Sequence, residues 1–234
     1  MRILDSSQVN KVLASSTGSL FIGETLNRRL SFARYRLNMS CKLICTGQAE
    51  DAITEYHGDI QSSGSGEVLG RVVARVVDID TGSFPVFDVL DCMDGDSSSH
   101  LALFDKSGGY SAGVLRILGQ DYTFSRNMLV IDKLELLPNA RGQGLSEVVL
   151  DLLIRKLGSS CRIAIVKPFP LQHAGSFSSD TDDWAKQMRY EGFNRNFSIG
   201  LAKLKRLYYK ANFRPLEQSH YMVRNLSKTF NWAQ

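Results

Sequence analysis

One stretch constrains this chain more than any other: between residues 128 and 157 an apolar run, a turn with two glycines and an amphipathic segment follow one another. The run 128–136 is rich in branched apolar residues and too short for a helix of its own, so it predicts a largely buried strand ending before Pro138. From Leu145 onward apolar residues recur at intervals of three and four, which is typical of one helix face, and Gly158 stands where such a helix is capped. The stretch predicts a strand, a tight turn and a helix.

The turn between this strand and this helix predicts an anion site. The first N–H groups of a helix have no partner within the helix and lie at the positive end of its dipole, and Arg141 stands beside them. A side chain at Gly142 or Gly144 would hold the backbone away from a ligand. A phosphate or pyrophosphate is the most natural ligand for this arrangement.

The glycine turn fits only one of three phosphate-binding patterns. A Walker loop needs Gly-Lys followed by Ser or Thr, which is missing here, and a dinucleotide fingerprint needs a third glycine where Glu147 stands. The spacing of Arg141, Gly144 and Ser146 instead resembles Gln/Arg-x-x-Gly-x-Gly/Ala, the acetyl-coenzyme A signature of the GNAT superfamily of N-acetyltransferases. Ser146 departs from that pattern, although it is small and its hydroxyl can bond a phosphate oxygen.

A second motif, in the correct order, supports the resemblance. Residues 207–213, Leu-Tyr-Tyr-Lys-Ala-Asn-Phe, are similar to the Leu-Tyr-x-Lys-x-Gly-Phe segment that follows the last cofactor-contacting helix of GNAT enzymes. Asn212 takes the glycine place, and asparagine is the next best residue at a left-handed helix cap. The similarity covers residues 67–226, and the chain resembles a bacterial-type member of the superfamily.

The resemblance implies an α/β (α+β) fold. In GNAT proteins a central, mixed, twisted sheet of about six or seven strands is flanked by helices and splays between the strands on either side of the coenzyme A-binding helix. Beyond the central stretch, the patterns predict strands over 68–80, 161–166 and 220–226, a helix over 199–211, two short helices over 84–104, a strand or hairpin over 109–127 and a long loop from 168 to 183.

The polar tract 61–66 predicts a flexible connector. It divides the chain into an N-terminal extension, residues 1–66, of unknown role and a GNAT acyltransferase domain, residues 67–234. Residues 20–45 contain alternating and basic stretches that fit either a helix or a strand.

Composition bounds the protein without selecting a function. The chain has 234 residues, 43% of them hydrophobic, which is enough to build a core, and its net charge of +4 is mild. No apolar run reaches the length of a membrane span or a signal peptide, so we expect a cytoplasmic protein without a membrane partner. Four cysteines fit reduced thiols, and Cys41 and Cys45 have no clustered histidine or second cysteine pair, so no metal is expected.

The resemblance also assigns the residues that would bind acetyl-coenzyme A, the implied co-substrate. The pantetheine arm would lie in the splay, bonding main-chain groups of Leu134 and Leu136 on one side and the end of the strand 161–166 on the other. The pyrophosphate would be held by the turn, that is by Arg141, Gly142, Gln143, Gly144, Leu145 and Ser146.

Amine acetylation requires an acid, and the amine must first lose a proton. Tyr208 matches the tyrosine of the family's Leu-Tyr position and is the expected general acid; the alternative is that its ring only packs the helix onto the sheet. Asp132 and Glu135 are the candidate bases. They are an odd number of residues apart, so on a regular strand their side chains point to opposite faces and only one can face the acceptor cleft. Asp132 would share a face with Leu134, which is two residues away. A water chain could replace either carboxylate.

Three functional hypotheses follow from these residues. The first is an N-acetyltransferase acting on an amine of a small molecule, a peptide or a protein, and a homodimer is left open. The alternative is a non-catalytic GNAT-like acyl-coenzyme A-binding or protein-interaction module, which the departures at Ser146 and Asn212 keep open. The third, rated below the others, is acetylation of aminoacyl-tRNA, with arginines between 28 and 36 meeting phosphates.

Overall fold

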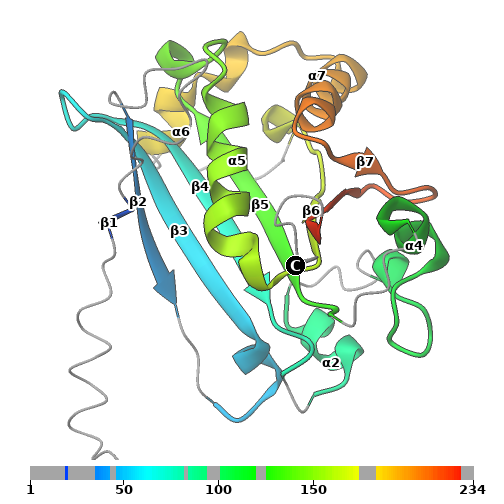
Figure 1. Ribbon diagram of the computed structural model, residues 1–234. Coiled ribbons are helices and arrows are strands. Elements are labelled where there is room, and N and C mark those ends of the chain that lie inside the picture. Colours follow the sequence, from blue (N-terminus) through cyan, green and yellow to red (C-terminus); the bar gives the residue numbers. More distant parts are fainter. Residues whose placement is uncertain are drawn as a thin grey trace, which may run out of the picture.

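The described residues form one mixed sheet of eight strands in the order β1-β2-β3-β4-β5-β6-β8-β7 (Figure 1). The computed structural model describes residues 19–20, 35–42, 46–81, 84–93, 101–119, 125–173 and 183–227. All neighbouring strands are antiparallel except β5 and β6, which are parallel. The strands are β1 (Ser19–Leu20), β2 (Tyr35–Lys42), β3 (Ile53–Ser62), β4 (Val68–Val77), β5 (Met128–Leu136), β6 (Ile163–Val166), β7 (Arg214–Pro215) and β8 (Met222–Asn225). The predicted α+β class with a mixed sheet is confirmed.

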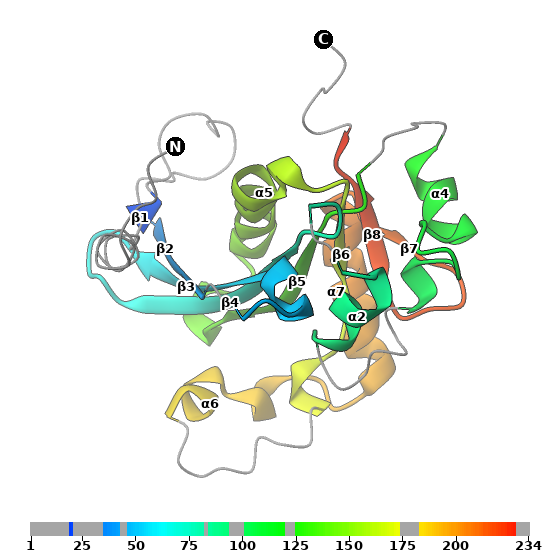
Figure 2. The same ribbon diagram turned by 90° about the horizontal axis from the view of Figure 1, so that it is seen from below.

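Helices cover both faces of this sheet. In Figure 2, α5 lies on one face, and α6 and α2 lie toward the other. The α-helices are α2 (Val86–Asp91), α4 (Ala112–Leu118), α5 (Leu145–Leu157), α6 (Asp183–Met188) and α7 (Phe197–Lys210). Short 3-10 turns are η2 (Ala49–Ala52), η3 (Leu101–Leu103), η4 (Pro138–Ala140), η5 (Gly158–Ser160), η6 (Leu171–His173) and η7 (Tyr190–Gly192). Across the described residues, none of these helices is long and apolar enough to cross a bilayer.

β5 is buried on both faces, which explains its nearly continuous apolar sequence. Leu129 and Ile131 belong to the cluster beneath α5, whereas Met128 and Val130 belong to the cluster that includes α2 and α4. Because side chains alternate along a strand, a run such as this one is apolar at every position only when both sides are covered.

A β-bulge interrupts β5 at Asp132. On the neighbouring strand β4, Val73 pairs with Lys133 and the next residue, Ala74, pairs with Ile131, so Asp132 is the extra residue. A bulge of this kind leaves one residue out of the ladder and bends the strand locally.

The bulge reverses the alternation of side chains that sequence parity assumes. Leu134 and Leu136 pack with the cluster beneath α5, as Ile131 does, although they are an odd number of residues away from it. Asp132 therefore does not share a face with Leu134, and this prediction is wrong. Asp132 and Glu135 both bond to residues on the face opposite α5, as described below.

Several elements agree with the sequence patterns, and one does not. The strands predicted at 68–80, 128–136, 161–166 and 220–226 are confirmed as β4, β5, β6 and β8, and the helix predicted at 199–211 is α7. The segment 109–127, predicted as a strand or hairpin, instead contains the helix α4. Ser111 caps this helix by accepting a hydrogen bond from Val114 N–H, and Gly119 ends it with φ 74°. Within 84–104, α2 confirms the first predicted helix. Of the range of the second, the structure describes only the turn η3, because residues 94–100 lie outside the described part.

The polar tract 61–66 lies in the turn of a hairpin. β3 pairs with β4 from Ile53↔Val77 to Gln61↔Val68, and Ser62 N–H donates to the carbonyl of Glu67. The described residues of 1–66 thus supply three strands, β1, β2 and β3, of the same sheet as β4. A short polar tract with glycines suits a turn as well as a linker. Within the long loop predicted from 168 to 183, residues 174–182 lie outside the described part.

Gly70→Ala should destabilise the protein by about 1–3 kcal/mol, because a Cβ at this β4 position would stand 2.4 Å from the carbonyl oxygen of Glu135 and force the two strands apart. Gly64→Ala is the control, since a Cβ there meets nothing within 4 Å. Urea unfolding monitored by circular dichroism measures both. Equal midpoints for the two variants would contradict the close approach of β4 and β5.

Candidate functional site

β5 and β6 pair for only four residues and then part. The parallel pairing runs from Met128↔Ile163 to Ile131↔Val166, where β6 ends, whereas β5 continues through Leu136. The pairing stops where the bulge at Asp132 begins. Among the described residues, one edge of residues 132–136 therefore has no strand beside it.

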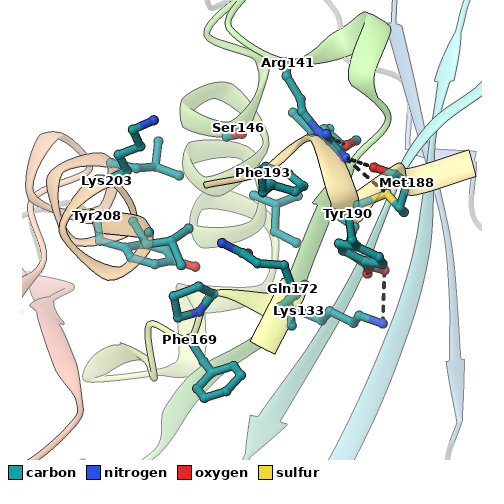
Figure 3. Close-up of a pocket in the computed structure, with 18 of the residues that line it drawn as sticks. Lys133, Arg141, Ser146, Phe169, Gln172, Met188, Tyr190, Phe193, Lys203 and Tyr208 are labelled. Atoms are coloured by element: carbon teal, nitrogen blue, oxygen red, sulfur yellow. Dashed lines mark hydrogen bonds and ion pairs between the residues drawn. The ribbon is translucent and has the colours of Figure 1, made fainter. Parts of the chain in front are cut away.

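A cavity of about 260 Å³ occupies the gap (Figure 3). Its walls come from β5, from the glycine turn, from the loop after β6, from the segment α6–η7 and from α7. Most of the predicted site residues line it, namely Asp132, Leu134, Glu135, Leu136, Arg141, Gly142, Ser146 and Tyr208. Gln143, Gly144 and Leu145 do not: Leu145 is buried in the core, and the amide of Gln143 donates to the carbonyl of Asn139 at 2.7 Å.

The glycine turn presents a row of unpaired main-chain donors. Gly142 and Gly144 have φ of 74° and 76°, a conformation that favours glycine, and a Cβ at Gly142 would meet only open space. The first main-chain bonds of α5 are donated by Glu147 and Val148, both to the carbonyl of Gly144. In the described part of the chain, the five N–H groups of residues 142–146 have no acceptor. Five donors at the start of a 13-residue helix suit an anion.

Arg141, expected beside the phosphate, joins two walls of the cavity. Its Nε donates to the carbonyl of Leu136 at 2.7 Å and its Nη2 to the carbonyl of Met188 at 2.6 Å. The guanidinium lies 4.2 Å from the centre of the Phe193 ring. Burial lowers the pKa of Arg141 from its usual value. Arg141 thus holds the end of α6 and the residues after η7 against the end of β5.

Glu135 anchors the same segment from the strand. It is 3% exposed, and its two oxygens accept hydrogen bonds from the Tyr190 hydroxyl at 2.6 Å and from the Trp184 indole at 3.1 Å. Lys133 Nζ lies 3.1 Å from the same carboxylate. A carboxylate with these partners positions the α6–η7 segment, so Glu135 is not placed to act as a free base.

Asp132 is also engaged. Arg75, buried on β4, donates from Nε to Oδ2 at 2.7 Å and from Nη2 to Oδ1, forming a bidentate pair, and its Nη1 donates to the carbonyl of Met93. Both predicted bases therefore line one cavity, contrary to the expectation that only one could, and both are held in ion pairs. The bulge accounts for the first fact, and Arg75 and Lys133 account for the second.

Tyr208 offers its hydroxyl to the cavity (Figure 3). Its ring also packs edge-to-face against Phe213, with centroids 5.7 Å apart, so the packing role and a role in the cavity coexist. Burial raises the pKa of Tyr208 to about 12. The neighbouring Tyr209 is 45% exposed and stands near Arg214 instead.

The sequence interpretation missed two groups of cavity residues. The loop after β6 contributes Phe169, Pro170 and Gln172, and the α6–η7 side contributes Tyr190 and Phe193. Two prolines directly after a buried strand were the available signal for the first group, because proline cannot continue a ladder. A second hollow shares Gln172, Tyr190 and Phe193 with the cavity; its other lining residues are His173, Glu191 and Arg195.

Lys203, on α7, is a further cavity residue that the sequence did not single out. At the C-terminal end of the same helix, Lys210 Nζ lies 3.1 Å from the carboxylate of Glu147, which is in the first turn of α5. Glu147, which stands where a dinucleotide fingerprint has its third glycine, is therefore paired with a lysine.

Comparison with the models of known protein families and with curated proteins finds no match for this chain. The resemblance to GNAT proteins rests on the two sequence motifs.

Glu135→Ala should loosen the α6–η7 segment, because it removes the acceptor of two side-chain donors and one partner of Lys133. We expect a loss of about 2 kcal/mol of unfolding free energy and faster tryptic cleavage after the exposed Lys186 and Arg189. Asp183→Ala is the control, since that carboxylate is 88% exposed and 3.8 Å from its partner. Equal cleavage rates in the two variants would show that Glu135 does not anchor the segment.

Proposed function

We propose that this protein is an acetyl-coenzyme A-dependent N-acetyltransferase of the GNAT type. The observation that carries the proposal is the cavity between the parted strands, which extends from Gly142 and Ser146, at the start of α5, to the bulge at Asp132. A long ligand with a phosphate end and a reactive end suits a cavity of this form.

The cofactor would bind mainly through the backbone. Its pyrophosphate would accept hydrogen bonds from the N–H groups of residues 142–146, to which Gln143 and Leu145 contribute main chain only. Its pantetheine arm would lie along the edge of β5 that faces away from β4, at Leu134 and Leu136, where an extended ligand can pair like an added strand. This mode of binding specifies few side chains, which is in keeping with the short sequence motif.

The chemistry is a direct transfer. The amine nitrogen attacks the thioester carbonyl carbon, N–H groups on the free edge of β5 stabilise the oxyanion, and the carbon–sulfur bond then breaks. The departing thiolate takes the phenolic proton of Tyr208, and the phenolate is then reprotonated through water by the proton that the amine has lost. Because Asp132 and Glu135 are both in ion pairs, the proton of the attacking amine leaves through water. This retains the water chain as the base and removes both carboxylates from that role.

The acceptor would be an amine of a small molecule, a peptide or a protein. We assign its approach to the second hollow, which meets the cavity at Gln172, Tyr190 and Phe193. We place the protein in the cytoplasm, and the described cysteines Cys41, Cys92 and Cys161, all free thiols, support a reducing compartment. The arginines at 28, 29 and 34, invoked for a tRNA acceptor, lie outside the described residues.

A non-catalytic acyl-coenzyme A-binding module is the second candidate. The observation that favours it is that both carboxylates lining the cavity are engaged with basic side chains. It shares the cofactor site with the enzyme and differs from it in the role of Tyr208.

Acetyl-coenzyme A at about 100 times its Kd should add about 2.7 kcal/mol to the unfolding free energy, seen as a rise in Tm of roughly 5 °C or more. Gly142→Ala should abolish this rise, because it forces the turn out of its left-handed conformation. Gly119→Ala is the matched control: it has the same φ of 74° and open space around the Cβ, but does not line the cavity. No rise in the folded wild-type protein would refute the cofactor assignment.

Tyr208→Phe should lower kcat by about a hundredfold and leave acetyl-coenzyme A binding unchanged, as expected for loss of a general acid. Tyr209→Phe, the exposed neighbour, should retain wild-type rates. Burial raises the pKa of Tyr208 to about 12, so its phenol stays protonated and its ionisation should not reduce kcat up to about pH 10. These rates are measured with the primary amine that the wild-type protein acetylates fastest. Cofactor binding without turnover, unchanged in Tyr208→Phe, would favour the binding module.

A further inference from the structure

The positive side chains around the proposed phosphate end are not equivalent. The guanidinium of Arg141 donates to the carbonyls of Leu136 and Met188 and stacks on Phe193, so its bonds serve the protein. Lys210 is paired with Glu147. A diphosphate would therefore find two of the nearby cations already engaged.

Lys203 is the cation at this end of the cavity that has no partner in the described part of the chain. It is exposed on α7 and lines the same cavity as Gly142 and Ser146; Figure 3 shows it across from Ser146 and Arg141. Its position follows from helix geometry. Lys203 precedes Lys210 by seven residues, about two helical turns, so both lie on one side of α7. The bond from Lys210 to Glu147 shows that this side meets the start of α5.

We propose that Lys203 binds the diphosphate of the cofactor opposite the amides of residues 142–146, an inference that rests on the proposed function. The helix terminus offers directed N–H donors but only about half a positive charge, whereas a diphosphate carries about two negative charges at neutral pH. A lysine ammonium supplies a full charge and three donors on a flexible stem. Two walls of the cavity then act together, because α5 orients the diphosphate and α7 neutralises its charge.

The test compares Lys203→Ala with Lys205→Ala, a variant of an exposed lysine on the same helix that does not line the cavity. Isothermal titration calorimetry measures the Kd of acetyl-coenzyme A for each variant and for the wild type. Lys203→Ala should raise this Kd about tenfold, the size of one charge-assisted hydrogen bond, and Lys205→Ala should raise it less than twofold. A repeat with 3′-dephospho-coenzyme A, which keeps the diphosphate, should give the same tenfold ratio.

The outcomes separate this inference from the function it rests on. If folded wild-type protein does not bind acetyl-coenzyme A, the proposed function fails. If wild-type protein binds and the two lysine variants have equal Kd values, the cofactor site stands and the assignment of Lys203 is overturned. It is also overturned if the tenfold effect vanishes with 3′-dephospho-coenzyme A, because the lysine would then serve the 3′-phosphate.

Discussion

The four-residue pairing of β5 with β6 is the constraint on which the rest of the structure depends. β6 ends at Val166, and the prolines at 168 and 170 that follow have no N–H to donate to a parallel ladder. On the opposite strand the bulge at Asp132 breaks the register at the same level. From Met128 to Ile131, β5 pairs with β6, and both faces of this part of the sheet are buried in the core. After Ile131 the two strands part, so the cavity forms without weakening the centre of the sheet.

The charged residues that border this opening mainly hold its walls together. The α6–η7 segment has only a small apolar anchor, in which Trp184 and Met188 pack with Leu137. Polar contacts supplement it: Glu135 accepts from Trp184, Arg141 donates to Met188, and Arg71 lies 4.2 Å from the centre of the Trp184 ring. A buried carboxylate or a half-buried guanidinium is stable only with such partners, since removing it from water is costly. The carboxylates of Asp132 and Glu135, the candidate bases of the sequence, therefore help to hold the walls of the cavity together.

Local patterns in the sequence predicted the centre of the fold well. The periodicities of 128–136 and 145–157 and the glycines between them are confirmed as β5, α5 and a left-handed turn. What local patterns could not show depends on partners far along the chain. Arg75 and Asp132 are 57 residues apart, and Glu135 is 55 residues from Tyr190. The bulge has no local signal either, and one extra residue reversed the inferred orientation of every side chain beyond it. In α4, the valine and isoleucine favoured a strand, but a serine cap and a glycine stop made a helix.

Some polar groups of the cavity are bonded to other residues of its walls and others are not, and this difference limits the chemistry that the cavity can perform. Both carboxylates in its lining have their oxygens occupied by Arg75, Lys133, Tyr190 and Trp184, so neither is free to remove a proton from a bound amine. The Tyr208 phenol, whose pKa is raised by burial, and the main-chain amides of residues 142–146, which have no acceptor among the described residues, are not tied up in this way. Such a site can donate a proton and hold negative charge, which are the demands of a departing thiolate and a phosphate-bearing donor. In the proposed acetyl transfer, removal of the amine proton is left to water, so the acceptor would reach the thioester through a hydrated side of the cavity.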